Sequence, residues 1–459
     1  MFIWDSSTSL EKVAWLGMKL QARSNELAFL RLYFTGRQAS TFLPSELIAQ
    51  LGNRMVNVNV NYCRKTVTAL TDRLSVTGFQ LDGSEDVDNE LYAVWKSNRM
   101  PVYLSHALND ALAYGSSYIS VWQGANGPQI AVESPFQVIP YIDPQTREPL
   151  GYLKQWGTID PLTNVPRSWS YLYLPDRTEV YVSDSAMPSN GIPSTAWQLE
   201  SVTPNPFGVL PIVQLVNTSD VLDQLGHSEF SDVIPLVDWL NKACLDLVSA
   251  SDSSGAPRKF LSGLKLKVDE DGNAVNPFAA EQARLWIAEQ PEARMAQFDG
   301  APLTNFIAEL HFVVQQIGVV ASLPEYLLGV TQPQPSSADG LRAQNLSLTT
   351  KAESKATLFS DGLGRVAALV RAIETGQHPD KIAVSPIWAA IDERSDAAST
   401  DAFVKLVQAG VPLPLAATKA LGWTPQDAAL LADAKPPAVV QQLPAPPTQT
   451  PYQQEIEAA

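Results

Sequence analysis

The stretch Phe230-Ser231-Asp232-Val233-Ile234-Pro235-Leu236-Val237-Asp238-Trp239-Leu240 opens a run in which apolar residues recur every three or four positions as far as Val248. This period is that of an amphipathic α-helix, so it predicts one helix over residues 229–254, about 37 Å long at ~1.5 Å per residue. Gly255 and Pro257 follow the run and end the helix, because glycine suits the C-terminal cap and proline cannot continue a helix.

A second long helix, opened by Pro302, is predicted over residues 302–325. The residues between the two helices, 255–301, change to a strand-like pattern. Phe260–Val268 and Arg284–Ile287 read as strands, and Asp271-Gly272 supplies a tight turn. Two long helices that flank a small β-rich insert therefore form the centre of the predicted fold.

A loop of unusual composition, Gly329–Ser337, follows the second helix and is rich in Gln, Pro and Ser. It leads into a third long helix that is predicted from Asp339 to about Thr375. Gly362 and Gly364 interrupt this helix, and we expect a kink there. A strand is predicted near residues 382–388.

The remaining sequence predicts helices and strands in separate blocks, so the fold class is α+β. The N-terminal block is predicted to be helical and then to form a mixed, mostly antiparallel sheet, with a hairpin at Asn126-Gly127. Predicted helices cover residues 8–35, 53–74, 87–98, 102–114, 397–409, 413–421 and 425–433, and further strands cover 151–156, 169–174 and 179–182. From Pro436 onward Pro, Gln and Thr dominate, which predicts a disordered tail.

The charge of the chain limits how it can meet nucleic acid. Of the 459 residues, 45% are hydrophobic, and the formal net charge is −16. A protein that grips DNA by its phosphates carries an excess of positive charge, so a broad basic DNA-binding face is excluded. An acidic wall would instead repel DNA and leave it free to slide. Charge alone equally fits an acidic protein with no such partner.

The sequence predicts neither a disulfide framework nor a membrane protein. Cys63 and Cys244 stand far apart in no metal-binding arrangement, which favours a reducing, intracellular setting. The first residues do not form a signal peptide. Apolar runs fall short of the ~18 residues of a membrane helix, and the nearest candidate, Phe306–Leu323, is interrupted by polar residues.

Catalytic motifs are absent from the sequence. It contains no phosphate-binding G-x-x-x-x-G-K-[ST] loop. Asp269-x-Asp271-x-Asn273 resembles the start of a calcium loop, but Ala274 and Ala280 replace the Gly and Glu that such a loop needs. The four histidines, His106, His227, His311 and His378, lack metal-ligand spacing. We therefore expect no catalytic residue, no metal and no cofactor.

Four basic residues gather in the β-rich insert: Arg258, Lys259, Lys265 and Lys267. Lys265 and Lys267 lie two apart and would share one face of a strand. The group is either a solvated surface or a docking surface for an acidic partner, and the sequence leaves both open.

The order of these elements resembles that of the portal proteins of long-tailed double-stranded DNA bacteriophages. The resemblance covers roughly residues 10–430, and short segments along the chain support it. These segments are Asn53-Arg54-Met55-Val56 through Arg73-Leu74 to Gly78-Phe79, Ala111–Tyr118, Glu133-Ser134-Pro135, Ile234–Asn241, and Leu323–Gly329 with Ser337–Arg342. Asp339 departs from the relatives, which often carry Gly or Ser plus Glu there.

A portal fold implies a division of the chain into named regions. It has an α/β wing, a two-helix stem, a small β-rich clip, a tunnel loop, a long kinked helix and a short helical crown. The implied boundaries are wing 1–228, first stem helix 229–254, clip 255–301, second stem helix 302–325, tunnel loop 326–338, long helix and return strand 339–392, crown 393–435 and disordered tail 436–459.

The resemblance also implies a function and a set of partners. The chain would form a ring, usually of twelve subunits, at one capsid vertex of the virion after assembly in the host cytoplasm. Double-stranded DNA would pass through the ring during packaging and ejection. The implied partners are terminase, head-completion or adaptor proteins, and the major capsid and scaffolding proteins. The DNA-facing loop would be Thr331, Gln332, Pro333, Gln334, Pro335, Ser336 and Ser337.

Two alternatives stay open at this point. A non-portal structural adaptor of the virion would also form rings, but it should lack two long helices around a β insert. An α+β enzyme of an unidentified class would need a deep pocket with converging polar groups.

Overall fold

The computed structural model describes most of the chain. The described residues are 7–39, 58–82, 87–161, 163–185, 196–218, 220–255, 259–262, 294–297, 302–329, 338–391 and 396–423, together with Trp4, Ala428 and Leu431.

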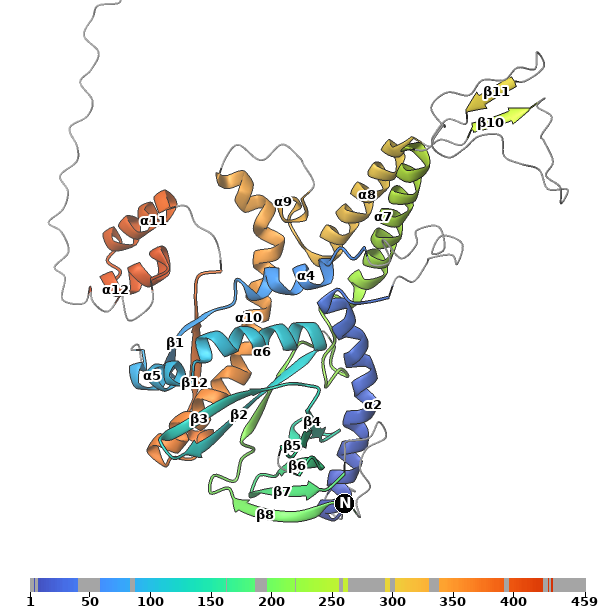
Figure 1. The fold of residues 1–459 in the computed structure, drawn as a ribbon. Coiled ribbons are helices and arrows are strands. Elements are labelled where there is room, and N and C mark those ends of the chain that lie inside the picture. The colour runs from blue at the N-terminus through green and yellow to red at the C-terminus, as the bar shows by residue number, and fades with distance from the viewer. Residues whose placement is uncertain are drawn as a thin grey trace, which may run out of the picture.

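Two long helices form a hairpin that extends away from the body of the molecule (Figure 1). They are α7, Ile234–Gly255, and α8, Leu303–Ala321. Strands β10, Lys259–Ser262, and β11, Arg294–Gln297, pair antiparallel at the far end of the hairpin. The two predicted helices around a β insert are thus confirmed, although α7 begins at Ile234, after a 3₁₀ turn. The predicted strand Arg284–Ile287 lies outside the described residues.

Among the described residues, four helices lie in the N-terminal part of the body. They are α2, Ser9–Thr35; α4, Tyr62–Thr71; α5, Asn89–Ser97; and α6, Met100–Tyr114. Thr8 opens α2 with a capping box, in which its hydroxyl accepts from the Glu11 amide and the Glu11 side chain accepts from the Thr8 amide. The sequence predicts α4 from residue 53, but residues 58–61 are not helical. The helix begins after Asn61, whose side chain accepts from the Arg64 amide and caps it.

The strands of the N-terminal part form two separate antiparallel sheets where the sequence predicts a mixed one. The order of the first is β3-β2-β9 and that of the second is β4-β5-β6-β7-β8. The predicted hairpin at Asn126-Gly127 is confirmed as the β2–β3 turn. Their bounds are β2 Ser116–Gly124, β3 Gly127–Glu133, β4 Val138–Ile142, β5 Pro149–Ile159, β6 Pro166–Tyr173, β7 Arg177–Ser183, β8 Gln198–Pro204 and β9 Ile212–Val216.

A further strand pair joins distant parts of the chain. The predicted strand near residues 382–388 is confirmed as β12, Val384–Trp388, and it pairs antiparallel with β1, Val76–Leu81. The sequence did not predict β1, because its six residues contain Gly78 and directly follow a helix. The partner strand lies some three hundred residues away, so no local pattern could indicate the pairing.

The third predicted long helix is α10, Ala338–Thr375, and it runs without interruption past both glycines. Gly362 and Gly364 allow α10 to pack closely against neighbouring strands. A Cβ atom on Gly362 would lie 2.5 Å from the Leu215 side chain, and one on Gly364 would lie 2.4 Å from the Val384 carbonyl oxygen. The two glycines therefore let α10 lie directly against β9 and β12.

The body contains two main hydrophobic cores. The larger one includes α4, α6, the three-stranded sheet, the base of the hairpin and α10, with Phe79, Leu108 and Phe359 among its fully buried side chains. The smaller one packs α2 against one face of the five-stranded sheet, through Leu16 and Leu153. A few residues around Tyr118 and Tyr152 connect the two sheets.

Short helices follow β12 near the C-terminus. They are α11, Asp396–Gln408, α12, Leu413–Ala416, and a π-helical turn, Ala417–Leu421. They agree with the predicted helices at 397–409 and 413–421. Most of the predicted helix at 425–433 and the whole tail from residue 436 lie outside the described residues.

Candidate functional site: the hairpin base and the loop anchors

Most of the predicted site residues lie outside the described residues. This applies to the whole loop Thr331–Ser337 and, in the insert, to Arg258, Lys265 and Lys267. The backbone of Lys259 is described and pairs with Gln297 in β10–β11. The structure does describe the elements that hold the loop and the insert, and their geometry decides what these segments can do.

The hairpin is packed along its length. Val237 and Leu240 of α7 and Val313 and Ile317 of α8 are buried in the same core. In the same turns, the ring of Trp239 meets that of Phe312 at 6.0 Å, and its Nε1 donates a hydrogen bond of 2.8 Å to Glu309 Oε1. These contacts make the two helices a single arm.

Hydrogen bonds fix the base of the arm to the body. The Tyr33 hydroxyl of α2 lies 2.9 and 3.0 Å from the two carboxylate oxygens of Asp238 and donates to that group. The Asn241 side chain accepts from the Val60 amide at 2.9 Å. Burial raises the pKa of Asp238, and the bond from Tyr33 partly offsets that rise. Asp238 therefore faces α2.

The chain that enters the loop 330–337 is held at its last described turn. Ser322 ends α8 in the left-handed conformation at φ 59°. Helix α9, Glu325–Leu328, then folds back so closely that a Cβ on Gly318 would lie 2.4 Å from Leu328 Cδ1. The Tyr62 hydroxyl of α4 donates 2.8 Å to the Leu328 carbonyl oxygen. The entry to the loop is therefore anchored to the body.

The chain that leaves the loop is held to the same junction. The Tyr326 hydroxyl of α9 donates 2.8 Å to Asn345 Oδ1, one turn or two inside α10. The Lys351 ammonium lies 3.5 Å from the Ala321 carbonyl oxygen at the end of α8. These contacts thus hold α8, α9 and the first half of α10 together, on both sides of residues 330–337 in the sequence.

A buried ion network lies beneath this junction. Glu229, just before α7, accepts from Lys351 at 2.6 Å and from Lys355 at 2.8 Å. Lys355 also donates to Asn217 at the end of β9, and Asn217 donates to Glu229. Burial raises the pKa of Glu229, but the two ammonium charges and their hydrogen bonds outweigh it, so that the pKa lies below its ordinary value. The network connects the arm, the long helix and the three-stranded sheet.

Sequence reasoning did not find this network, because its members come from distant segments. One signal was available. Lys351 and Lys355 stand one turn apart beside Leu348 and Ala352, which are fully buried. Two lysines beside a buried helical stripe require a buried carboxylate, since an unpaired ammonium in a core is costly.

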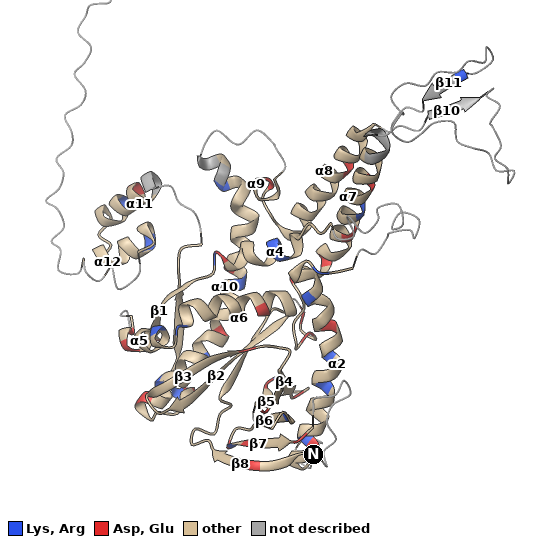
Figure 2. Cartoon of the chain, viewed as in Figure 1, with Lys and Arg blue, Asp and Glu red and all other residues tan. Residues whose placement is uncertain are grey.

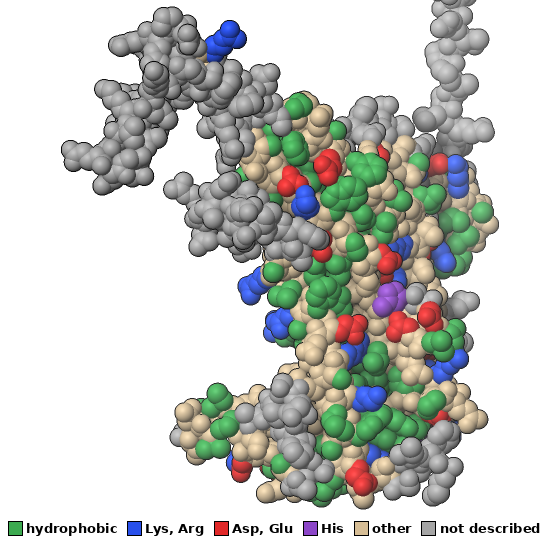
Figure 3. Space-filling view, turned by 90° about the vertical axis from the view of Figure 1, so that its right-hand side faces the viewer, with side chains coloured by type: hydrophobic (Ala, Val, Ile, Leu, Met, Phe, Trp, Pro, Cys, Tyr) green, Lys and Arg blue, Asp and Glu red, His purple; other side chains and the backbone are tan. Residues whose placement is uncertain are grey.

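In the part of the arm that the structure describes, there is no basic stripe that could hold DNA phosphates. Helix α8 contains no Lys or Arg. On α7, Lys242 pairs with Asp246, and Figure 2 shows acidic and basic residues interspersed along the arm. On the face of the molecule in Figure 3, Lys and Arg side chains are scattered and do not form one field.

The outer surface of α8 is apolar and exposed. Val319 is 75% exposed and Leu346, on the adjoining α10, is 65% exposed; Ile307, Phe312 and Val320 are also exposed. Among the described residues α8 alone is long and apolar enough to cross a membrane, by length and composition only, although the sequence predicted no such helix. An exposed apolar surface of this kind marks a place where another molecule packs.

Within the described part of the chain, no three His, Cys, Asp or Glu side chains are grouped so that they could hold a metal ion. Of the two described acid–histidine pairs, His227 lies 3.0 Å from Asp223, and His378 lies 3.6 Å from Asp380. Each pair is local in sequence, with its members four and two residues apart.

Comparison with known proteins places these elements in a family. The model for "Phage portal protein, SPP1 Gp6-like" matches residues 50–421. The portal proteins of Mycobacterium phages D29 and L5 are each 26% identical over 370 residues, which covers 76% of this chain and 72% of theirs. A chain from the virion of a native gene transfer agent particle aligns with a TM-score of 0.46 at 12% identity, covering 83% of this chain and 94% of that one. A chain from the neck of the native particle, computed with C12 symmetry, aligns at 0.43 and 11%, with the same coverage.

Proposed function

The chain belongs to the SPP1 Gp6-like family of phage portal proteins and is a portal subunit, and we propose that copies of it form a ring, most simply a dodecamer, at one vertex of the virion's capsid. Double-stranded DNA passes through this ring during packaging and ejection. The ring assembles in the host cytoplasm. The single observation that carries the ring is the exposed apolar surface of α8, which a neighbouring subunit would cover.

A second copy fits that surface better than a lipid bilayer does. The arm carries charged side chains beside that surface, Lys242 and Asp246 on α7 and Glu309 on α8 itself. Charged side chains in the middle of a bilayer cost several kcal/mol each, roughly 2.5 or more. A protein neighbour leaves these groups at its polar rim and still covers Val319 and Val320. We therefore propose no membrane contact.

The portal regions implied by the sequence carry over as part of this proposal. The stem is the arm of α7 and α8, and the clip is the insert at its far end. The tunnel loop joins α9 to α10. We propose that terminase docks on the clip during packaging and that head-completion or adaptor proteins replace it, with the basic group Arg258, Lys259, Lys265 and Lys267 as contacts. The major capsid and scaffolding proteins would meet the wing, residues 1–228, and the crown, residues 393–435.

The tunnel loop is proposed to touch DNA without trapping it. Its polar residues, Gln332, Gln334, Ser336 and Ser337, are uncharged, and its two prolines restrict the backbone. A ring of lysines at the same place would add phosphate contacts that oppose movement. The anchors at Leu328 and Asn345 would hold this neutral loop at a constant position while DNA slides past.

The test replaces the neutral loop with a charged one. A Gln332→Lys, Gln334→Lys subunit should still form rings, but phage carrying it should package far less DNA, because the added phosphate contacts around the ring oppose movement. Gln377→Lys, Gln408→Lys is the matched control, since both glutamines are exposed and lie outside the loop. Electron microscopy would verify the rings, and gel analysis would measure the packaged DNA. Equal DNA filling in the two variants would contradict the channel-facing placement of the loop.

We propose no catalytic role, cofactor or metal for the subunit. The alternative of a non-portal adaptor is set aside, because the family match covers most of the chain, including both helices of the arm.

A further inference from the structure

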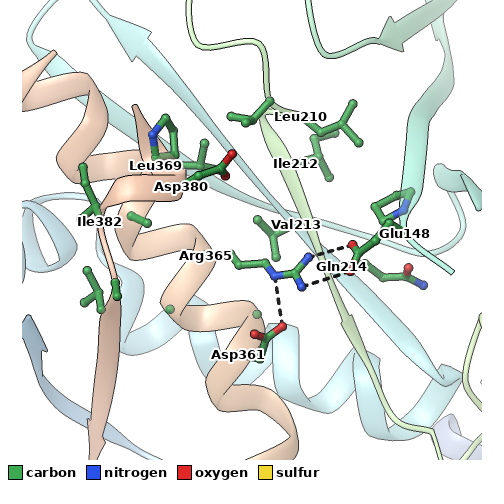
Figure 4. Close-up of a pocket in the computed structure, with 18 of the residues that line it drawn as sticks. Glu148, Leu210, Ile212, Val213, Gln214, Asp361, Arg365, Leu369, Asp380 and Ile382 are labelled. Carbon is green, nitrogen blue, oxygen red and sulfur yellow. Dashed lines mark hydrogen bonds and ion pairs between the residues drawn. The ribbon is translucent and has the colours of Figure 1, made fainter. Parts of the chain in front are cut away.

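A groove of about 820 Å³ lies on the wing, away from the arm. One wall consists of the α10 turns around Arg365 and of the segment from Pro379 to Pro386. The other wall consists of β9 and of the turns that begin β5 and end β6. The groove thus lies between β9 on one side and α10 with the segment leading into β12 on the other (Figure 4).

The floor of the groove is apolar and partly open. Leu210, Ile212 and Val213 contribute from the β9 side, and Leu369 and Ile382 from the other side. Leu210 and Ile382 are only half-buried. The floor is narrow because Gly362 and Gly364 bring α10 against β9 and β12. Apolar side chains in a groove of this size can bury those of a ligand.

Internal hydrogen bonds fix the conformation of the turn between β4 and β5, and this turn presents charged groups to the groove. The buried Asp143 carboxylate accepts from the Gln145 amide and from the Thr146 hydroxyl. Arg147 adopts φ 62°, which residues other than glycine seldom adopt, and its amide donates to the Asp143 carbonyl oxygen. Backbone strain that the surrounding hydrogen bonds maintain is concentrated at functional positions. The next residue, Glu148, accepts from Arg365 at 3.1 Å and so joins the turn to α10.

The rim of the groove is acidic. Its charged residues are Asp82, Glu148, Asp361 and Asp380 against Arg147 and Arg365, so carboxylates exceed guanidinium groups by two. Arg365 is occupied by Glu148 and, at 3.1 Å, by Asp361. In the part of the chain that the structure describes, neither Asp82 nor Asp380 is paired with a Lys or Arg. Figure 4 shows Asp380 well apart from the Arg365 cluster.

We propose that this groove binds an extended peptide segment of a partner protein, one that alternates apolar side chains with Lys or Arg. The apolar side chains lie on Leu210, Ile212 and Ile382, and the basic ones reach Asp82 and Asp380. A compact ligand fits less well, because small-molecule sites need converging polar groups, and these carboxylates are spread along both walls. Pro386 has no backbone N–H, so β12 cannot offer an unbroken row of donors to an added strand. The peptide is therefore held mainly through its side chains.

The test uses the purified full-length chain and a defined probe. The probe is a fluorescein-labelled peptide of sequence Leu-Lys-Val-Lys-Leu-Lys-Val, and its counterpart has Glu at each Lys. Fluorescence anisotropy should show saturable binding of the Lys peptide alone. Binding should weaken at least about tenfold in Asp82→Lys, Asp380→Lys. It should stay within about twofold of wild type in Glu200→Lys, Glu353→Lys, the same charge change at exposed sites off the groove.

Three results would overturn the proposal: absence of saturable binding to the wild-type chain, equal loss in the two variants, or equal binding of the Glu peptide. Equal loss would mean that general charge attraction, not the groove, holds the probe. None of these readouts depends on ring assembly or on DNA. The proposal of peptide binding in the groove can therefore be refuted without affecting the proposal of a DNA-conducting ring, and the reverse also holds.

Discussion

Replacing Glu229 with Gln removes the carboxylate that two lysines share at the hairpin base. The Glu229 side chain is 7% exposed, and those of Lys351 and Lys355 are 23% and 14% exposed. Loss of one member of a buried ion pair costs about 3–5 kcal/mol, because the other charge stays buried without a partner. The slight exposure of both lysines lets water reach them, so we expect the Glu229→Gln free energy of unfolding to fall by about 2–4 kcal/mol.

The assay is denaturant unfolding of the body, supplemented by amide hydrogen exchange at the start of α7 and in the Lys351–Lys355 turn of α10. Glu353→Gln is the matched control, because Glu353 lies between the two lysines but is exposed. Surface changes of that kind stay within about 0.5 kcal/mol. A second variant, Lys355→Met in the Glu229→Gln background, removes one of the orphaned charges and should restore part of the loss.

The same reasoning sets a pH window. Because the pKa of Glu229 is lowered in the folded chain, its contribution is present above the ordinary Glu value and is lost as the pH falls through the folded pKa. The wild-type advantage over Glu229→Gln should therefore hold at neutral pH and begin to decline as the pH falls below the ordinary Glu value of about 4.3. The reasoning is refuted if Glu229→Gln and Glu353→Gln unfold alike at neutral pH.

Two further predictions concern the ring and the wing. Val319→Asp should abolish ring formation, measured by particle mass, because Val319 is 75% exposed and its substitution leaves the subunit folded. The control is Ile159→Asp, at an exposed residue of a strand, and this variant should still form rings. Rings in both variants would contradict the α8 interface. Burial raises the pKa of Asp110 to about 6, with a Ser134 hydrogen bond and Arg31 opposing the rise. Such a group stabilises the fold fully below its unfolded pKa and loses that effect as the pH rises through the folded value. The stability of Asp110→Asn in thermal melts should therefore match that of the wild type near pH 4 and exceed it by about 1–2 kcal/mol at pH 8. Equal melting of the two proteins at both pH values would contradict this prediction.

The periodic elements of this fold could be predicted from the sequence, and its junctions could not. The first helix of the arm was predictable because apolar residues at helical spacing from Val233 to Val248 indicate both the helix and its buried face. The hairpin at Asn126-Gly127 was predictable because that dipeptide favours the turn itself. In both cases the deciding interactions lie within a few residues of each other in the chain.

Other features depend on partners far away in the sequence. Strand β1 exists because β12 pairs with it. Gly364 reads locally as a helix breaker, yet its role is to admit the Val384 carbonyl oxygen. The start of α4 depended on recognising Asn61 as a cap rather than on apolar periodicity. Tyr62, which anchors the loop entry, lies beside that cap and carries no signal of its partner at Leu328.

The contacts at Leu328 and Asn345 allow two properties of the proposed tunnel loop to be tested separately, its position and its chemistry. The position depends on residues outside the loop, namely Tyr62, Tyr326 and the Glu229–Lys351 pair. The chemistry that we propose for the loop comes from its own uncharged residues, Gln332, Gln334, Ser336 and Ser337. A lysine substitution in the loop should therefore impair DNA passage in a subunit whose unfolding is normal. Glu229→Gln should instead loosen the junction and leave the loop neutral, so a packaging defect there would show that position matters as well as charge.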